Sequence, residues 1–340
     1  MASSKKIIVV IGATGKQGFS VARTFVPLPE WHVRCVSRNP SSPASLALKA
    51  LGAEVVQADL SDVASLIRAF SNANAVFINT DFWGLYIAAK KTAATPENAE
   101  AASNIIAFEG EVSYGKNAAR TAASVPSLER FVYSAISSPK DSDGNYPPSH
   151  HASKAVVVDY ILKEEPELAK KTSFIYPGGY NTNPLLSPRV DPSSGKYAFV
   201  LPISKSARMP IIDPKVSTGP FVRGLIEDEE AGAKLLAYDS YLSFEEVAEL
   251  WSKASGQEAS YLEVSATFLH EKFGIPHIVL DGATSLAEFG YMGGMKGYIE
   301  PFQMKKPVQT QSFESWLNGR DWKEVLGAKD FARPAFRSME

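Results

Sequence analysis

The sequence has few cysteines and no long apolar runs, the features typical of secreted and membrane-bound proteins. Its 340 residues include one cysteine, Cys35, so neither a disulfide framework nor a thiolate metal site can form within one chain. No apolar run approaches the length that spans a bilayer, and the segment from Met1 to Lys6 has no apolar signal-peptide core. We therefore expect a protein of the cytoplasm, or of the nucleus, without membrane contact.

An excess of charge of one sign is lacking as well. The 35 Lys and Arg residues nearly balance the 37 Asp and Glu residues, and no five like charges follow one another. DNA binding through phosphate neutralisation needs a basic face. We therefore expect no direct nucleic-acid partner.

The motifs of two other enzyme classes are absent. The pair His270–Glu271 does not begin an H-E-x-x-H zinc motif, because Gly274 stands at the last position. The five histidines show no metal-ligand spacing, and the nucleophile motif G-x-S-x-G does not occur. We expect neither a metal site nor an α/β-hydrolase.

The first half of the chain alternates short apolar runs with helical patterns. Continuous apolar strands between helices indicate a parallel sheet covered on both faces, and right-handed crossovers make it a doubly wound, Rossmann-like α/β sheet. The expected strands are Ile7–Ile11, His32–Val36, Glu54–Gln57, Ala75–Asn79, Arg130–Ser134 and Ser173–Tyr176. The expected helices are Lys16–Phe25, Ser42–Leu51, Val63–Phe70, Glu97–Ala123 and His151–Lys163.

The second half has a different composition: it is rich in Pro, Gly, Ser and Asn at first, and helical patterns return later. Helices are expected at Thr218–Glu227 and Phe244–Ala254, the second with a capping box of Ser243 and Glu246, and a strand near Lys234–Tyr238. We expect residues 1–180 to form the sheet domain, with a return segment at about 205–240. Residues 181–340 would form a smaller α+β lobe.

Three glycines follow the first expected strand, in KKIIVVIGATGKQGFSVARTF. Gly12, Gly15 and Gly18 permit a tight turn, a close approach of pyrophosphate to the backbone, and close packing of helix on sheet. Because they follow a strand, precede a helix and open a β–α repeat, they predict a dinucleotide-binding loop, and a tight turn without ligand is the alternative. Further cofactor contacts are expected from Thr14, Lys16 and Gln17 in the same loop.

The carboxylate that usually holds the ribose 2′-hydroxyl of NAD, at the end of the second strand, is missing. No acidic residue stands between Trp31 and Ala53, and HVRCVSRNP places Arg38 at the strand end, where a guanidinium suits a 2′-phosphate. The sequence therefore predicts NADP(H), with a solvated loop arginine as the alternative. Asp59 and Leu60 after the third strand could frame the adenine, or Asp59 could be the N-cap of the next helix.

The catalytic pattern of reductases on this scaffold is incomplete. These enzymes often carry Tyr-x-x-x-Lys on a helix and a serine at the end of the fifth strand. In YPPSHHASKAVVVDYI the lysine is Lys154, but His150 replaces the tyrosine, and Ser134 ends the strand in FVYSAISS. Lys154 would orient the nicotinamide ribose and Ser134 would contact a carbonyl or the nicotinamide. His150 would either act as a general acid or only cap the helix or bond a loop.

With these residues the sequence resembles the NmrA-like family, a group of atypical short-chain dehydrogenases/reductases. VIGATGKQG resembles its dinucleotide loop, VSRNP its 2′-phosphate site, and the His…Lys pair a sensor branch in which histidine also replaces the tyrosine. FINTDFW and YPGGYNTN resemble the fourth-strand segment and the loop over the nicotinamide. The resemblance implies further cofactor contacts from Thr80, Asp81, Phe82, Pro177 and Tyr180.

The resemblance continues into the second half, in MPIIDPKVSTGPFV, SFEEVAELWSKASG and SFESWLNGRDW. One departure is the long, Ala-rich stretch Gly84–Ala107, which could cover a substrate, form a partner surface or be a tolerated surface insertion.

Two functions follow from the resemblance. The first is an NADPH-dependent reductase of a small organic carbonyl, imine or activated alkene. The second is a non-catalytic NADP(H) sensor that acts through protein–protein contacts.

Overall fold

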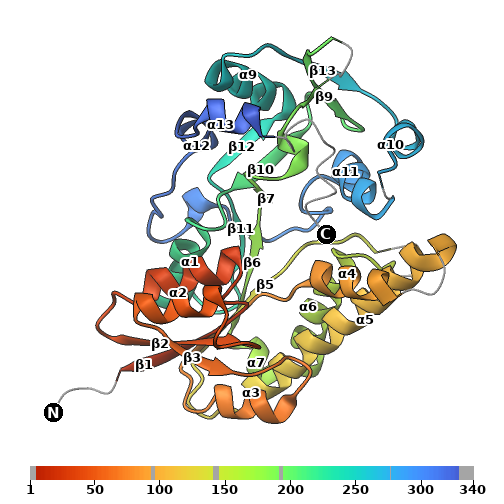
Figure 1. Cartoon of the computed structure of the whole chain (residues 1–340). Helices are drawn as coiled ribbons and strands as arrows, with labels where there is room; N and C mark the ends of the chain where they lie inside the picture. The colour runs from red at the N-terminus through yellow and green to blue at the C-terminus, as the bar shows by residue number, and fades with distance from the viewer. Residues whose placement is uncertain (1–4, 93–95, 141–144, 191–193, 276, 329–340) are drawn as a thin grey trace.

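The computed structural model describes residues 5–92, 96–140, 145–190, 194–275 and 277–328. In these residues a seven-stranded sheet of order β11-β6-β5-β4-β1-β2-β3 runs through the part of the molecule that carries the N-terminus (Figure 1). Every strand pair in it is parallel. The strands are β1 (Lys6–Ile11), β2 (Trp31–Ser37), β3 (Glu54–Gln57), β4 (Ala75–Ile78), β5 (Arg130–Ser134), β6 (Thr172–Pro177) and β11 (Lys234–Ala237). The predicted Rossmann-like α/β fold is confirmed.

Helices cover both faces of this sheet, which explains why its strands are apolar throughout. Val9 and Ile11 of β1 pack into the core beneath one helical layer, and Ile8 and Val10 into the core beneath the other. The first layer contains α3 (Val63–Ala69), α5 (Pro96–Ala123) and α6 (Ala152–Glu164), followed by the short α7 (Pro166–Ala169); the second contains α1 (Lys16–Phe25), α2 (Pro43–Leu51) and α8 (Thr218–Glu227).

Two helices beside this sheet were not among the predicted elements, the short α7 and the longer α4 (Phe82–Thr92). Helix α4 forms an antiparallel pair with α5, so that much of the stretch Gly84–Ala107 is helical. The side chain of Asp81 accepts a hydrogen bond from the backbone N–H of Gly84 at 3.1 Å, which supports the first turn. The aromatic residues and the glycine at its start masked the helical pattern.

The second half of the chain builds two small sheets and a separate core. One sheet has the order β12-β10-β7 and the other β13-β9-β8. Their strands are β7 (Gly179–Tyr180), β8 (Arg189–Val190), β9 (Tyr197–Leu201), β10 (Arg208–Ile212), β12 (Ser240–Ser243) and β13 (Ala259–Glu263). The helices are α9 (Phe244–Ser255), α10 (Ala266–Phe273), α11 (His277–Phe289), α12 (Phe313–Asn318) and α13 (Trp322–Gly327), with 3₁₀ turns η1 (Pro184–Leu186) and η2 (Pro301–Gln303).

The expected capping box of α9 is present. The hydroxyl of Ser243 accepts from the backbone N–H of Glu246 at 3.1 Å, and the carboxylate of Glu246 accepts from the backbone N–H of Ser243 at 2.7 Å. The return segment includes β10, α8, which packs on α1, and β11, which joins the edge of the large sheet. The division at residue 180 stays a prediction.

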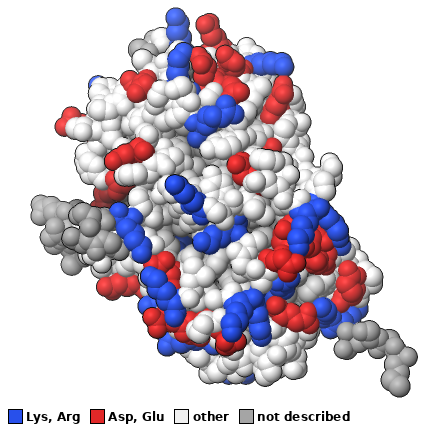
Figure 2. Space-filling model, turned by 180° about the vertical axis from the view of Figure 1, so that it is seen from behind, with Lys and Arg blue, Asp and Glu red and all other residues white. Residues whose placement is uncertain are grey.

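Acidic and basic side chains are interspersed over the face of the molecule seen in Figure 2. Among the described residues, no helix combines the length and the apolar character that a membrane crossing requires.

Candidate cofactor and active site

The turn between β1 and α1 has the close approaches that the glycine spacing predicts. Gly12 has φ +73°, and a Cβ there would lie 2.7 Å from the carbonyl oxygen of Asn79. A Cβ on Gly18 would overlap the backbone of Gly12. The backbone N–H of Gly15 donates to the Gly12 carbonyl at 3.0 Å and closes the turn. The chain can therefore leave the sheet and enter the helix in this way only with glycine at positions 12 and 18.

The N-terminus of α1 is open to a ligand. Gly15 is its N-cap residue, no side chain caps it, and its first turn holds no acidic residue. Thr14, Gly15 and Lys16 are exposed there. Free N–H groups and the positive end of the helix dipole at the carboxyl edge of a parallel sheet suit a pyrophosphate.

The side chain of Gln17 does not point at this opening but bridges two other elements. The hydroxyl of Ser134, at the end of β5, donates to Oε1 of Gln17 at 2.8 Å, and Nε2 of Gln17 donates to the hydroxyl of Tyr180 at 2.8 Å. Lys16 donates to the hydroxyl of Thr182 at 3.1 Å, and its ammonium lies 5.5 Å from the centre of the Tyr180 ring. The glycine loop, β5 and the segment after β6 are thus linked side chain to side chain.

A buried ion pair stands at the end of β4. The ammonium of Lys154 lies 3.0 Å from Oε1 of Glu111 and donates to the hydroxyl and the carbonyl of Thr80, at 2.7 and 3.1 Å. The carboxylate of Glu111 also accepts from the hydroxyls of Thr80, at 2.6 Å, and Ser153. The side chains of Lys154 and Glu111 are 8% and 0% exposed. The three N–H groups of the ammonium therefore have three protein acceptors.

Glu111 is a residue of this site that was not predicted. It lies on the buried face of α5, in line with Ser103, Ala107 and Gly115 at intervals of four residues. A carboxylate in a stripe of small buried residues is a signal that a basic partner faces it. The four-residue spacing around Glu111 could be seen in the sequence, but the sequence did not show that Lys154 on α6 is its partner.

His150 occupies a different environment from the one expected. Helix α6 begins at Ala152 with His151 as its N-cap residue, so the expected start at His151 is one residue early and His150 neither lies in the helix nor caps it. Its ring packs against Trp83, with centres 5.1 Å apart, and its Nδ1 has no hydrogen-bond partner in the part of the chain described. Burial, together with His151 and Lys154, holds the pKa of His150 well below its usual value, so the ring is neutral.

At the ends of β2 and β3 lie the residues expected around the adenosine. Arg38 is exposed directly after β2. The pKa of Asp59 is lowered, chiefly by the hydrogen bond from the Ser61 hydroxyl, with a further contribution from the guanidinium of Arg38. The alternative that Asp59 caps the next helix is wrong: Asp62 accepts from the first backbone N–H groups of α3. The carbonyl of Leu60 accepts from Asn117 on α5 at 2.9 Å.

Some of the other residues expected to contact the cofactor already contact other parts of the protein. The ring of Phe82 is 3% exposed and packs against Trp83. The carbonyl of Pro177 accepts from the hydroxyl of Tyr291 at 2.7 Å. Asp81 is exposed at the start of α4. The cofactor roles of all these residues stay predictions.

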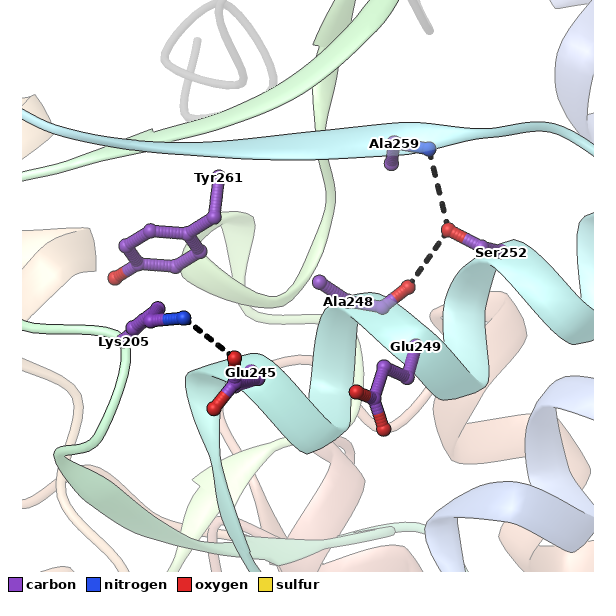
Figure 3. Close-up of a pocket in the computed structure, with 7 residues that line it drawn as sticks. All are labelled: Lys205, Glu245, Ala248, Glu249, Ser252, Ala259 and Tyr261. Atoms are coloured by element: carbon purple, nitrogen blue, oxygen red, sulfur yellow. Dashed lines mark hydrogen bonds and ion pairs between the residues drawn. The ribbon is translucent and has the colours of Figure 1, made fainter.

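A pocket of about 530 Å³ lies elsewhere, beside α9 and β13 (Figure 3). Lys205, Glu245 and Tyr261 are among the residues that line it, and the first two form an ion pair at 2.6 Å. Its lining includes none of the residues expected to bind cofactor or to take part in catalysis. No group of His, Cys, Asp and Glu side chains within the described ranges is arranged to hold a metal ion.

The model of the NmrA-like family matches residues 4–324. The chain belongs to the NmrA-like family. Among its relatives, the NmrA-like family domain-containing oxidoreductase hkm9 of Aspergillus hancockii is 27% identical over 292 residues, which cover 82% of this chain and 81% of hkm9. The oxidoreductase cpsB of Aspergillus campestris is 49% identical over 79 residues, and this alignment spans 23% of each chain.

Solved structures share the fold of this NmrA-like protein. The negative transcriptional regulator NmrA in complex with NADP has a TM-score of 0.62 at 22% identity, covering 99% of this chain and 97% of NmrA. The complex of leucoanthocyanidin reductase from Vitis vinifera with NADPH has a TM-score of 0.66 at 15% identity, covering 92% and 98%. NmrA also has a structure with NAD. These neighbours bind NADP or NAD on the same Rossmann-like framework.

Proposed function

We propose that this NmrA-like protein is an NADPH-dependent reductase of a small organic carbonyl, imine or activated alkene. The observation that carries the proposal is the buried ammonium of Lys154, held at the sheet edge that also carries Ser134 and the open N-terminus of α1. Burying a charge costs free energy, and buried charged groups are therefore often found at functional sites. This is also the edge at which doubly wound sheets bind ligands. The relatives described as oxidoreductases support the same class of reaction.

The residues present fit NADP(H), which would supply a hydride. The first turn of α1 would hold the pyrophosphate, and Arg38 the 2′-phosphate. Glu111 and Thr80 hold the side chain of Lys154 in place at the end of β4. A hydroxyl of the nicotinamide ribose would replace one of the three protein acceptors of Lys154, and Lys154 would then orient the ribose.

The test is oxidation of NADPH, followed optically, with a panel of quinones, aldehydes, imines and enones. We expect turnover with at least one member and a loss of about 30-fold or more without the ammonium. Because Lys154→Ala also leaves Glu111 buried without a partner, the double variant Lys154→Met/Glu111→Leu, which removes both charges, is measured beside it. Circular dichroism checks that each variant is folded.

The matched control is Lys163→Met on the same helix, whose ammonium is exposed and pairs with Asp159. It should oxidise NADPH at the rate of the unchanged protein. Full turnover in the folded double variant would exclude a role for Lys154 in the reaction.

Cofactor preference depends on Arg38 in this proposal. Replacing it by glutamine removes the cation that would face the 2′-phosphate, while NAD⁺ carries only an uncharged hydroxyl there. We expect calorimetry to show NADP⁺ binding weakened at least tenfold and NAD⁺ binding changed less than twofold. Arg68→Gln on α3, where the side chain is exposed, is the control. Tighter binding of NAD⁺ than NADP⁺ by the unchanged protein would exclude the proposed preference.

A second function is favoured by one observation: the neutral ring of His150 replaces the usual acidic tyrosine. In this alternative the protein binds NADP(H) without turnover and changes a contact with a protein partner, as suggested by the structural likeness to a transcriptional regulator. Tight binding of NADP(H) in calorimetry, with no oxidation of NADPH by any panel member, is the result that would favour it.

A further inference from the structure

Reduction of a carbonyl or imine needs a proton as well as a hydride, and the proposed function therefore requires an acid. His150 stands at the position of the usual tyrosine, but its ring is neutral and lies in an aromatic cluster with Phe82 and Trp83. Another group must then supply the proton, and its assignment rests on the proposed function.

Most hydroxyl groups near the ends of β4, β5 and β6 already donate a hydrogen bond to an acceptor within the protein. Thr80 and Ser153 donate to Glu111, and Ser134 donates to Gln17. The hydroxyl of Tyr291 donates to the carbonyl of Pro177. None of these groups can release a proton to a ligand without breaking a hydrogen bond inside the protein.

Two further tyrosines are enclosed in the core. Tyr133 on β5 and Tyr176 on β6 are 0% and 1% exposed and pack beneath α5 and α6. Neither side chain is exposed, so neither presents its hydroxyl at the surface of the protein, where a ligand would arrive.

Tyr180, the last residue of β7, differs from all of these. Its hydroxyl accepts from Nε2 of Gln17 at 2.8 Å, so the lone pair is used and the phenolic proton has no acceptor among the described residues. The side chain is partly exposed, three residues after the end of β6. Gln17 is itself held by Ser134 at the end of β5, so the phenol has a defined place next to the glycine loop.

We propose that Tyr180 is the catalytic acid of this protein, in place of the tyrosine missing at position 150. As the acceptor carbon gains the hydride, the electron pair of the broken π bond moves to the oxygen or nitrogen, which takes the phenolic proton of Tyr180. The nicotinamide is oxidised, and Tyr180 regains a proton from water.

The groups around the phenol keep its proton in place. Burial raises the pKa of Tyr180, the hydrogen bond from Gln17 opposes this rise, and the carboxylate of Asp81 adds to it, so the hydroxyl stays protonated at neutral pH. The other groups that face it are the ammonium of Lys16, over its ring, and the hydroxyl of Tyr291.

The first test needs no substrate. Tyrosinate absorbance is titrated with pH in the complexes with NADP⁺ and with NADPH, which differ in the charge of the nicotinamide. If Tyr180 faces that ring, its pKa should be lower with NADP⁺ by about one pH unit, because a nearby positive charge favours the phenolate. The difference should vanish in Tyr180→Phe. An equal titration in the two complexes, or a difference that persists in Tyr180→Phe, would overturn the assignment.

The second test is turnover of NADPH with the acceptor panel. Tyr180→Phe should lose about 100-fold or more, the range of general acid catalysis, with NADPH affinity within twofold. Tyr160→Phe is the control: it removes a hydroxyl that donates to Glu165 on the far end of α6 and should leave the rate unchanged. If Tyr180→Phe does not fold, Tyr180→Gln replaces it, since glutamine can keep the hydrogen bond to Gln17 but supplies no acid.

The outcomes separate this inference from the proposed function. Oxidation of NADPH that persists in Tyr180→Phe overturns the role of Tyr180 and leaves the reductase in place. The absence of oxidation by the unchanged protein with every acceptor overturns the proposed function, and the catalytic role of Tyr180 with it.

Discussion

Replacing Glu111 by alanine is expected to lower the free energy of unfolding by about 3–5 kcal/mol. The carboxylate is fully buried and is the only anion paired with Lys154 in the described structure. Its removal leaves an ammonium in a low-dielectric interior and takes an acceptor from the hydroxyls of Thr80 and Ser153. An unpaired buried charge costs more than the pair contributed, because the desolvation is no longer offset.

Urea unfolding followed by circular dichroism measures this effect. Glu129→Ala is the matched control, because Glu129 pairs with Lys6 at 2.6 Å while both side chains are about half exposed, and its loss should cost less than about 1 kcal/mol. The double variant Glu111→Leu/Lys154→Met should recover most of the lost stability. A loss in Glu111→Ala no larger than that in Glu129→Ala would show that the pair is not buried as described.

Replacing Gly18 by alanine is expected to cost about 3 kcal/mol of stability and to abolish measurable NADP⁺ binding. The added Cβ would overlap the carbonyl and Cα atoms of the turn at Gly12 and Ala13, which are backbone atoms that cannot rotate away. Helix α1 must then move off the sheet, and its N-terminus moves with it. Stability and cofactor binding are therefore expected to fall together.

Thermal unfolding and calorimetric titration with NADP⁺ test this pair of effects. Gly327→Ala, at the last residue of α13, adds the same methyl group where no atom lies within 4 Å, and should change stability by less than about 0.5 kcal/mol. A Gly18→Ala protein that binds NADP⁺ as before would disprove the role given to the close helix–sheet contact.

Much of the fold could be predicted because its signals are local. Continuous apolar strands between helical patterns carry the parallel sheet, and β3, β5, α1 and α8 have the predicted bounds. The capping box of Ser243 and Glu246 and the glycine turn are also set by residues a few positions apart. Helix α4 was missed because aromatic residues and a glycine begin it, and its support comes from packing on α5.

The site was predictable only in part, for the same reason. The sequence by itself determined which chemical groups are available: the glycine turn, Arg38 after β2 with no acidic residue between Trp31 and Ala53, Ser134 and Lys154. Only the tertiary structure decided which groups meet, since Gln17 and Tyr180 are 163 positions apart and Gln17 and Ser134 are 117. Glu111 reaches Lys154 because α5 and α6 pack side by side, and the ring of His150 lies against Phe82 and Trp83 because α4 packs there, while its catalytic role stays a prediction. Contacts between distant segments depend on how the helices pack on the sheet, and no local sequence pattern determines this packing.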